Sequence, residues 1–269
     1  MSDQSKMRAL TEPTYWEQIW AASDLPRPFD PSDGSVRSSA NMAFHRLFSE
    51  VLRAEPCEEG SLVELGCSQS KWLPYFRKEH KLLVAGIDYS PLGCARARLM
   101  LRREQCEGEI VEADIFNPPN NLRMRFDVVL SVGLVEHFTD TAAAVAACAT
   151  FARPGGLVIT IIPNLSGAIG AVQRNLDRGI YDKHSPLTRE GLQEGHEKCG
   201  LSILRSEYLT PANFAIVNHP ALRPPILSKL IRGVLVTITA AAWATDRFVV
   251  SLPVNQLLSS YVVCVARKS

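Results

Sequence analysis

One stretch decides the fold of this 269-residue chain: Leu62-Val63-Glu64-Leu65-Gly66-Cys67-Ser68-Gln69-Ser70. A short apolar run ends on an acidic residue, and a turn containing Gly66 then leads into residues 71–76, which read as a helix. Glycine suits this turn because the chain reverses sharply there and a ligand can approach the backbone. The free N–H groups at the start of the helix favour a negative group. The sequence therefore predicts a strand, a turn and a helix that bind a ligand.

A second apolar run, residues 82–87, is followed by Asp88. The distance in sequence between the first turn and Asp88 is typical of nucleoside-binding sites. An acidic residue about twenty residues after the first turn lies at the tip of the next parallel strand, where it reaches a ribose. A dinucleotide fingerprint would need two more glycines, but Ser68 and Lys71 stand in those places. The sequence therefore predicts a nucleoside with a smaller anionic group, such as a carboxylate, in place of a diphosphate.

The first motif is one of five segments that occur in a defined order between residues 60 and 165. Together they resemble the class I S-adenosylmethionine-dependent methyltransferase family, whose first motif is an acidic-x-Gly-x-Gly strand and turn. Ser68 replaces the usual second glycine, which affects the path of the loop and leaves the site in place. The other four segments are Gly86 to Pro91, Val111 to Asp114, Phe126 to Ser131 continuing to Glu136-His137-Phe138, and Arg153 to Val158.

The alternation of apolar runs and helical patterns, together with this resemblance, predicts an α/β fold. We expect a Rossmann-like, seven-stranded, mostly parallel sheet with an antiparallel last strand and helices on both faces. Residues 1–56 would form an N-terminal helical leader, and residues 57–269 the methyltransferase domain, with an apolar, lid-like insertion at 210–259 between strands six and seven. The expected strands lie at 62–64, 82–87, 109–112, 126–132, 157–162, 201–209 and 260–266.

The resemblance implies S-adenosylmethionine as the cofactor and gives the polar residues at the strand ends their roles. Asp88 would accept the ribose hydroxyls, Asp114 would accept the adenine amino group, and Glu64 would orient the loop and reach the ammonium group through water. The other expected cofactor contacts are Gly66, Cys67, Ser68, Tyr89, Ala113, Ile115, Ser131, Val132 and Gly133.

Two histidines are candidate catalytic bases, because the acceptor must lose a proton when it takes the activated methyl group. His137 follows the fourth strand, although a Glu-His pair here also serves packing or cofactor positioning. His184 lies in an expected loop after the fifth strand, where a solvated surface residue is the alternative. Glu136 and Tyr181, next to these histidines in the sequence, are expected to contact the substrate.

Trp16 and Trp20 lie on one face of a helix predicted in the leader. Helically spaced aromatic residues usually pack one element onto another. The alternative is that the two tryptophans close the cofactor and substrate cleft, since aromatic faces attract cations such as a sulfonium.

Composition limits the partners, metal sites and cellular location that we expect for the protein. The net charge is +1, with both signs interspersed, so we expect no nucleic-acid partner. The seven cysteines form no C-x-x-C pair and no carboxylate cluster has ligand spacing, so we expect no metal and no disulfide scaffold. The amino terminus is polar and shows no signal peptide, and we expect a cytoplasmic protein.

The insertion offers the best information on substrate. Residues 225–232 are amphipathic and residues 233–245 are apolar throughout, a run shorter than the roughly 20 residues that span a bilayer. We therefore expect no transmembrane segment. Three roles stay open: a lid over an apolar substrate pocket, which we favour; an interface between copies of the chain through 225–245; or a membrane-surface helix with Arg223, Lys229 and Arg232 facing lipid head groups.

These observations favour methyl transfer, by in-line displacement, to an apolar or amphipathic small molecule such as a secondary metabolite or an isoprenoid-like compound. The alternative is a membrane-associated lipid or quinone methyltransferase. Two other functions are less favoured. A nicotinamide-dependent oxidoreductase would need glycines that this sequence lacks. A non-catalytic nucleoside-binding regulator would have no need of histidines on the acceptor side.

Overall fold

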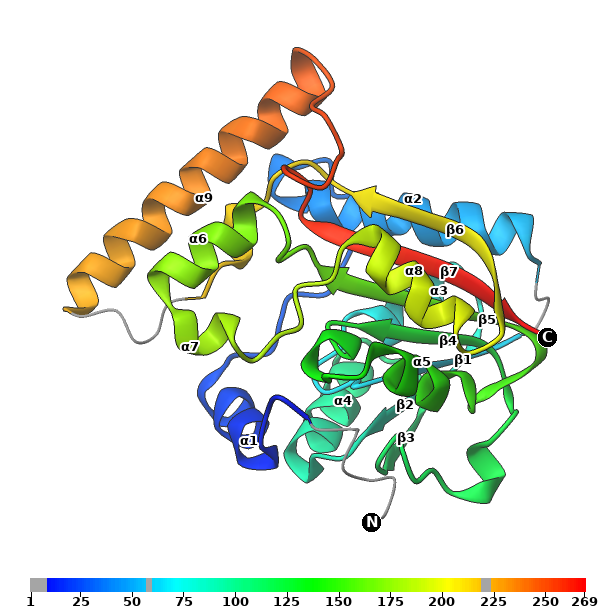
Figure 1. Ribbon diagram of the computed structural model, residues 1–269. Coiled ribbons are helices and arrows are strands. Elements are labelled where there is room, and N and C mark those ends of the chain that lie inside the picture. Colours follow the sequence, from blue (N-terminus) through cyan, green and yellow to red (C-terminus); the bar gives the residue numbers. More distant parts are fainter. Residues whose placement is uncertain (1–8, 57–59, 219–223) are drawn as a thin grey trace.

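The computed structural model describes residues 9–56, 60–218 and 224–269. A single seven-stranded sheet forms the centre, in the order β3-β2-β1-β4-β5-β7-β6 (Figure 1). All neighbouring pairs are parallel except those made by β7, which is antiparallel to β5 and β6. This confirms the predicted fold class. The strands are β1 (Ser61–Leu65), β2 (Leu83–Asp88), β3 (Glu109–Glu112), β4 (Phe126–Val132), β5 (Ala152–Pro163), β6 (Leu201–Leu209) and β7 (Tyr261–Lys268).

Helices cover both faces of the sheet, and each face has its own apolar core. On one face lie α2 (Ser39–Ala54), α3 (Trp72–Glu79) and α4 (Pro91–Arg103), which contribute residues to a core with Leu62. On the other face lie α5 (Thr141–Ala149) and α8 (Arg189–Glu197), packed with Val63. Successive strand residues point to opposite faces, so an unbroken apolar run is what a strand buried on both faces requires.

The strand register brings the ligand motifs to one edge. Leu65 pairs with Ile87 on one side and Ser131 on the other, and Asp88 pairs with Glu112. The carboxyl ends of β1, β2, β3 and β4 therefore lie side by side, and open sheets of this kind bind ligands at that edge.

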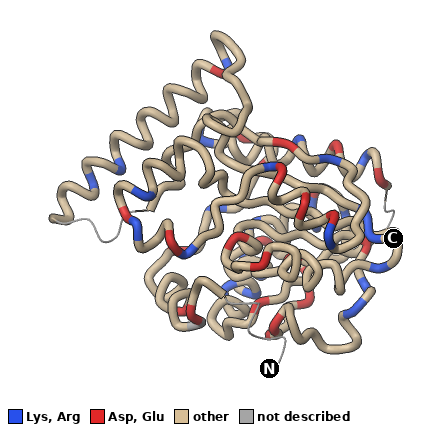
Figure 2. Tube along the Cα trace, viewed as in Figure 1, with Lys and Arg blue, Asp and Glu red and all other residues tan. Residues whose placement is uncertain are grey.

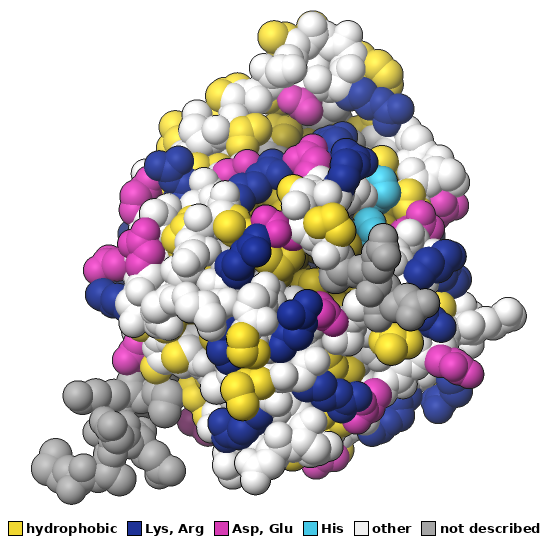
Figure 3. All heavy atoms as spheres, turned by 90° about the vertical axis from the view of Figure 1, so that its right-hand side faces the viewer, with side chains coloured by type: hydrophobic (Ala, Val, Ile, Leu, Met, Phe, Trp, Pro, Cys, Tyr) yellow, Lys and Arg dark blue, Asp and Glu magenta, His cyan; other side chains and the backbone are white. Residues whose placement is uncertain are grey.

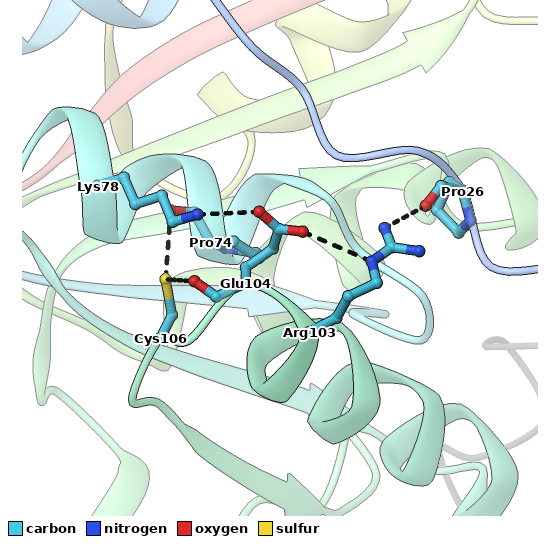
Figure 4. A network of polar contacts seen from close by, with 6 residues as sticks. All are labelled: Pro26, Pro74, Lys78, Arg103, Glu104 and Cys106. Atoms are coloured by element: carbon cyan, nitrogen blue, oxygen red, sulfur yellow. Dashed lines mark hydrogen bonds and ion pairs between the residues drawn. The ribbon is translucent and has the colours of Figure 1, made fainter.

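The leader is attached to the domain along α4. Glu17 of α1 (Pro13–Ala22) accepts a hydrogen bond from Ser90 Oγ, at the residue that caps α4. Arg96 donates to the carbonyl of Ser23 at 2.6 Å, and Arg103 donates to the carbonyl of Pro26 (Figure 4). The next residue, Glu104, pairs with Lys78 of α3 at 2.9 Å. Residues 17–26 are thus held against α4. A short 3₁₀ helix, η2 (Val36–Ser38), precedes α2.

Two helices, α6 (Ala168–Leu176) and α7 (Arg178–Tyr181), precede His184. Of the two, α7 lies in the segment where a loop was expected. The expectation of a loop at 178–186 is wrong for residues 178–181. Helix α6 packs directly on the chain before it, since a Cβ added at Gly170 would lie 1.8 Å from the carbonyl oxygen of Leu165.

The apolar insertion forms one helix, α9 (Pro225–Phe248), which lies beyond the edge of the sheet near α6 (Figure 1). The length argument made from the sequence is wrong, because the helix continues through Gly233 and has 24 residues. It is long and apolar enough to cross a membrane by length and composition, and its most apolar 18-residue window has a mean hydropathy of 1.5 and is 17% buried. Such a helix alone is weak evidence for a membrane span. Arg223 lies outside the described residues.

Gly86 and Gly233 give a matched pair of stability variants. Gly86→Ala places its Cβ 2.6 Å from Cys67 Sγ and should lower the free energy of unfolding by about 1 to 3 kcal/mol through overpacking. Gly233→Ala meets no atom within 4 Å and should raise it by about 0.5 to 1 kcal/mol. Urea unfolding measures both. An unchanged midpoint for Gly86→Ala would contradict the close contact between β2 and the turn after β1.

Candidate functional site

The turn after β1 is tied to the end of β2 by backbone hydrogen bonds. Gly66 has a φ of 71°, and the N–H groups of Gly66 and Cys67 both donate to the carbonyl of Ile87, at 2.8 and 3.2 Å. Ser68 N–H donates to Oδ2 of Asp88 at 3.0 Å. The first two motifs therefore form one unit, although twenty residues of sequence separate Ser68 from Asp88.

A cavity of about 460 Å³ opens at this edge of the sheet. It brings together most of the residues that sequence analysis predicted for the cofactor, from all four parallel strand ends. The predicted residues that line it are Trp16, Trp20, Gly66, Asp88, Tyr89, Ala113, Asp114, Ile115, Val132, Gly133 and His137. Sequence analysis did not predict the other lining residues, which are apolar except for Thr11: Ala9, Thr11, Ile87, Phe116, Leu134 and Phe138.

The two aspartates of this cavity are oriented by nearby backbone groups. Oδ1 of Asp88 accepts from Ser90 N–H at 2.9 Å, and Oδ1 of Asp114 accepts from Phe116 N–H at 3.0 Å. Burial raises the pKa of Asp88, opposed by its two backbone hydrogen bonds. Each carboxylate oxygen has a second lone pair, so both side chains keep acceptor capacity for hydroxyl and amino groups. A ribose and an adenine fit this donor and acceptor pattern.

Glu64, Cys67, Ser68 and Ser131 are buried and do not line this cavity. Glu64 accepts a short hydrogen bond from the hydroxyl of Ser70, beside the start of α3. Burial raises the pKa of Glu64 to about 8. This places Glu64 where it orients the loop, with no direct contact to the cavity among the described residues.

Lys71 stands beside this buried carboxyl group. Burial lowers the pKa of Lys71 to about 8, opposed by Glu64. The hydroxyls of Ser68 and Ser131 are buried, and neither has a hydrogen-bond partner in the part of the chain that the structure describes. Buried polar atoms of this kind are usually satisfied, so a polar ligand group or water is the expected partner.

The leader forms the roof of the cavity. The indole of Trp16 makes an edge contact with the imidazole of His137, with ring centroids 4.9 Å apart, and stacks on Trp20 at 5.4 Å. Leu10 N–H donates to the carbonyl of His137 at 2.8 Å, and Ala9 forms an isolated bridge with Phe138. The tryptophans thus line the cavity as well as packing the leader onto the domain.

A second cavity, of about 230 Å³, adjoins the first and shares Val132, Gly133 and His137 with it. One end is polar, with Glu136, His137 and His184. The rest is lined by the side chains of Ile161, Pro163, Leu165, Ile169, Gln173, Ile180, Ile216, Val217, Asn218 and Tyr261. This is the shape and polarity of a site for an amphipathic molecule.

Sequence analysis missed most of the second cavity because its wall depends on contacts between distant residues. Gln173 of α6 donates to the carbonyl of Asn218 at 2.7 Å and accepts from its N–H at 2.9 Å. These bonds hold the segment after η5 (Phe214–Ile216) against α6. No motif in the sequence connects two residues that lie this far apart.

The two candidate bases lie at the polar end of the second cavity. Burial lowers the pKa of His137 to about 3, with a smaller contribution from His184, and burial also lowers the pKa of His184. Both imidazoles are therefore neutral near pH 7. His137 lines both cavities and His184 lines only the second.

One prediction for this region needs correction. Tyr181, expected to contact the substrate, lines neither cavity, and the guanidinium of Arg174 lies over its ring at 5.9 Å. The expectation of no metal rested on the lack of a C-x-x-C pair and of a carboxylate cluster with ligand spacing, and nothing in the structure tests it. The fold does bring His184 beside Glu136 and His137, with one ligand atom from each residue within 4.8 Å of the others.

Comparison with known proteins agrees with this geometry. Residues 63–160 match a family model described as a methyltransferase domain. The ubiquinone biosynthesis O-methyltransferase of Rhodopseudomonas palustris (strain BisB18) is 28% identical over 158 residues, which cover 55% of this chain and 60% of that protein. The chain thus matches less than two thirds of the length of this relative.

Solved structures share the fold at low identity. A SAM-dependent methyltransferase from Archaeoglobus fulgidus has a TM-score of 0.54 and 15% identity, covering 87% of this chain and 96% of that one. Geranyl diphosphate C-methyltransferase from Streptomyces coelicolor A3(2), in complex with Mg2+, geranyl diphosphate and S-adenosyl-L-homocysteine, has a TM-score of 0.56 and 13% identity, covering 96% and 98%. The matched family model and the strand order together identify residues 63–160 as a methyltransferase domain with the fold of the class I S-adenosylmethionine-dependent methyltransferases.

Proposed function

We propose that this chain transfers a methyl group from S-adenosylmethionine to an oxygen of an amphipathic, quinone-related acceptor that it takes up at a membrane surface. The observation that carries the proposal is the pair of adjoining cavities, which share Val132, Gly133 and His137. The first suits a nucleoside, and the second suits a molecule with a polar head and an apolar body. The name of the Rhodopseudomonas relative supports the quinone-related class.

The chemistry divides between the cofactor and the protein. S-adenosylmethionine supplies a methyl group on a sulfonium, already activated for displacement. The chain has to hold the acceptor in line with that methyl group and to remove a proton from its hydroxyl. The neutral imidazoles of His137 and His184 lie at the end of the second cavity that meets the first. A regulator that only bound a nucleoside would not need them there.

Helix α9 supports delivery from a membrane. Ile226, Leu230 and Val234 form a stripe at four-residue spacing and are 62%, 61% and 57% exposed. The only charged residues between 225 and 245 are Lys229 and Arg232, both basic (Figure 2). An exposed apolar stripe with basic residues beside it suits the surface of an anionic bilayer.

The buried side of α9 connects this surface to the acceptor cavity. Leu235 packs in one small core with Leu165, Ile169 and Val217, and the latter three line the second cavity. Among the described residues, none of α9 lines the cofactor cavity or the second cavity. The lid role favoured from the sequence therefore has less support than membrane contact. An interface between copies of the chain stays the competing role for the exposed stripe. Elsewhere, the face shown in Figure 3 intersperses basic and acidic side chains.

The cofactor assignment predicts a strong effect at Asp88. Asp88→Asn should weaken S-adenosylhomocysteine binding at least about 100-fold, because charge-assisted hydrogen bonds contribute about 1.5 to 3 kcal/mol each and two are affected. Isothermal titration calorimetry measures the Kd. Asp182→Asn, at an exposed position just after α7, serves as the matched control and should bind like the wild type. Equal affinity in both variants would place the ribose elsewhere.

The acceptor assignment predicts that affinity follows the apolar tail. With labelled S-adenosylmethionine and hydroxylated aromatic acceptors, each added isoprene unit that enters the second cavity should lower KM at least about tenfold, since a buried methylene contributes about 0.8 kcal/mol. Ile216→Ser should reduce this dependence, and Leu99→Ser, exposed on α4, should leave it unchanged. A KM that does not change with the length of the apolar tail would contradict an apolar acceptor.

The membrane assignment predicts binding to anionic vesicles through α9. Lys229→Glu combined with Arg232→Glu should weaken co-sedimentation with phosphatidylcholine and phosphatidylglycerol vesicles at least about tenfold, since each basic residue contributes about 1 kcal/mol at such a surface. Leu230→Glu should weaken binding to neutral vesicles as well. Concentration-dependent dimers that Leu230→Glu abolishes, without vesicle binding by the wild type, would favour the interface instead.

A further inference from the structure

Three side chains of metal-ligand type meet at the polar end of the second cavity. Glu136 and His137 belong to the 3₁₀ helix η4 (Val135–His137) that follows β4, and His184 follows α7. One ligand atom from each residue lies within 4.8 Å of the other two. The imidazole centroids of the two histidines are 4.5 Å apart. The backbone joins both segments, because Ser185 N–H donates to the carbonyl of Glu136 at 2.7 Å.

Hydrogen bonds to the backbone select the same tautomer in both imidazoles. Nδ1 of His137 lies 2.8 Å from the carbonyl oxygen of Lys183, and Nδ1 of His184 lies 2.8 Å from that of Ile180. A carbonyl oxygen only accepts, so Nδ1 must carry the hydrogen in each ring. The Nε2 atoms then present lone pairs, as in histidine ligands oriented by a hydrogen bond from the other nitrogen.

His196 shows how a structural histidine differs. Its Nδ1 also lies 2.8 Å from a backbone carbonyl, that of Leu192, but its Nε2 is 3.0 Å from the hydroxyl of Thr160. Both ring nitrogens of His196 therefore have a hydrogen-bond partner. Within the described residues, Nε2 of His137 and of His184 has no hydrogen-bond partner of this kind.

Glu136 lacks the partners that a buried carboxylate requires. The residue is 2% exposed, and Oε2 has no hydrogen-bond partner among the described residues. Oε1 lies 4.0 Å from Nε2 of His137, which is longer than a hydrogen bond. A buried carboxylate without hydrogen bonds or a cation is costly. A bound cation removes that cost.

We propose that Glu136, His137 and His184 bind a divalent transition-metal ion at the polar end of the acceptor cavity. Two imidazoles and one carboxylate form the ligand set of Zn²⁺, Mn²⁺ and Fe²⁺ sites that keep open positions. Ligand atoms about 2.1 Å from an ion stand roughly 3 to 3.6 Å apart, so the ligand atoms need to approach one another by up to about 1.2 to 1.8 Å. All three residues line the cavity proposed for the acceptor.

The role of the ion, unlike its binding, rests on the function proposed above. A divalent cation lowers the pKa of a hydroxyl that coordinates it, so the acceptor oxygen loses its proton to solvent and keeps an electron pair. That pair forms the new oxygen–carbon bond, and the carbon–sulfur bond breaks with its electrons staying on sulfur. In this arrangement the imidazoles hold the ion, and neither has to act as the general base.

The site is tested by metal titration of the full chain after chelator treatment. Calorimetry with Zn²⁺ and Mn²⁺, and the visible absorption of Co²⁺, should report one ion per chain. Glu136→Gln and His184→Gln should each raise the Kd at least about 100-fold, since even second-shell changes cost 10 to 100-fold. His80→Gln, at the end of α3, is the histidine control and should bind the ion like the wild type.

S-adenosylhomocysteine binding shows that each variant is folded, because Glu136 and His184 do not line the cofactor cavity. Absence of stoichiometric binding by the wild type, or equal binding by all variants, would overturn the site. Undiminished methyl transfer by the metal-free protein would overturn the role of the ion and favour histidine as the base. Specific ion binding with no methyl transfer to any acceptor would support the site and count against the proposed function.

Discussion

The carbonyl of Ile87 is the point on which the cofactor site depends. It accepts both N–H groups of the turn after β1, and Asp88, the next residue, accepts the N–H of Ser68. The turn therefore cannot move without the second strand. Gly86 makes this close approach feasible, since any side chain there would collide with Cys67. Ser68, in place of a second glycine, costs little because the loop is fixed by these bonds and not by glycine alone.

Burial of carboxyl groups is the second electrostatic property of the site. Burial raises the pKa values of Glu64, Asp88 and Glu136 and so favours their protonated, neutral forms, although Lys71 lies beside Glu64. A cation that binds beside such a group displaces the proton and stabilises the carboxylate. An ammonium group, a sulfonium and a divalent ion are all cations, so each component proposed for the cleft would compensate for this burial.

The sequence predicted the features that depend on short stretches of the chain. It did not predict the features that depend on contacts between distant residues. The strands, Gly66 and Asp88 followed from local patterns whose spacing reflects the sheet, and the antiparallel end and Asp114 followed from the resemblance to the methyltransferase family. The wall of the second cavity did not, because Gln173 meets Asn218 only after α6 folds. The sequence analysis treated residues 225–232 and 233–245 as separate segments, but they form one helix, α9. Gly233 does not end this helix, because glycine lowers helix stability only modestly and no atom lies within 4 Å of the place where its Cβ would be.

The roof over the cofactor cavity has a kinetic consequence. Residues 9 to 20 cover the nucleoside site through the Leu10–His137 hydrogen bond and the indole of Trp16. A ligand that passes through this roof has to break these contacts, and lid opening of this kind limits turnover in many enzymes. His137 takes part both in this roof contact and in the polar end of the second cavity, so a change in the position of its ring alters both cavities.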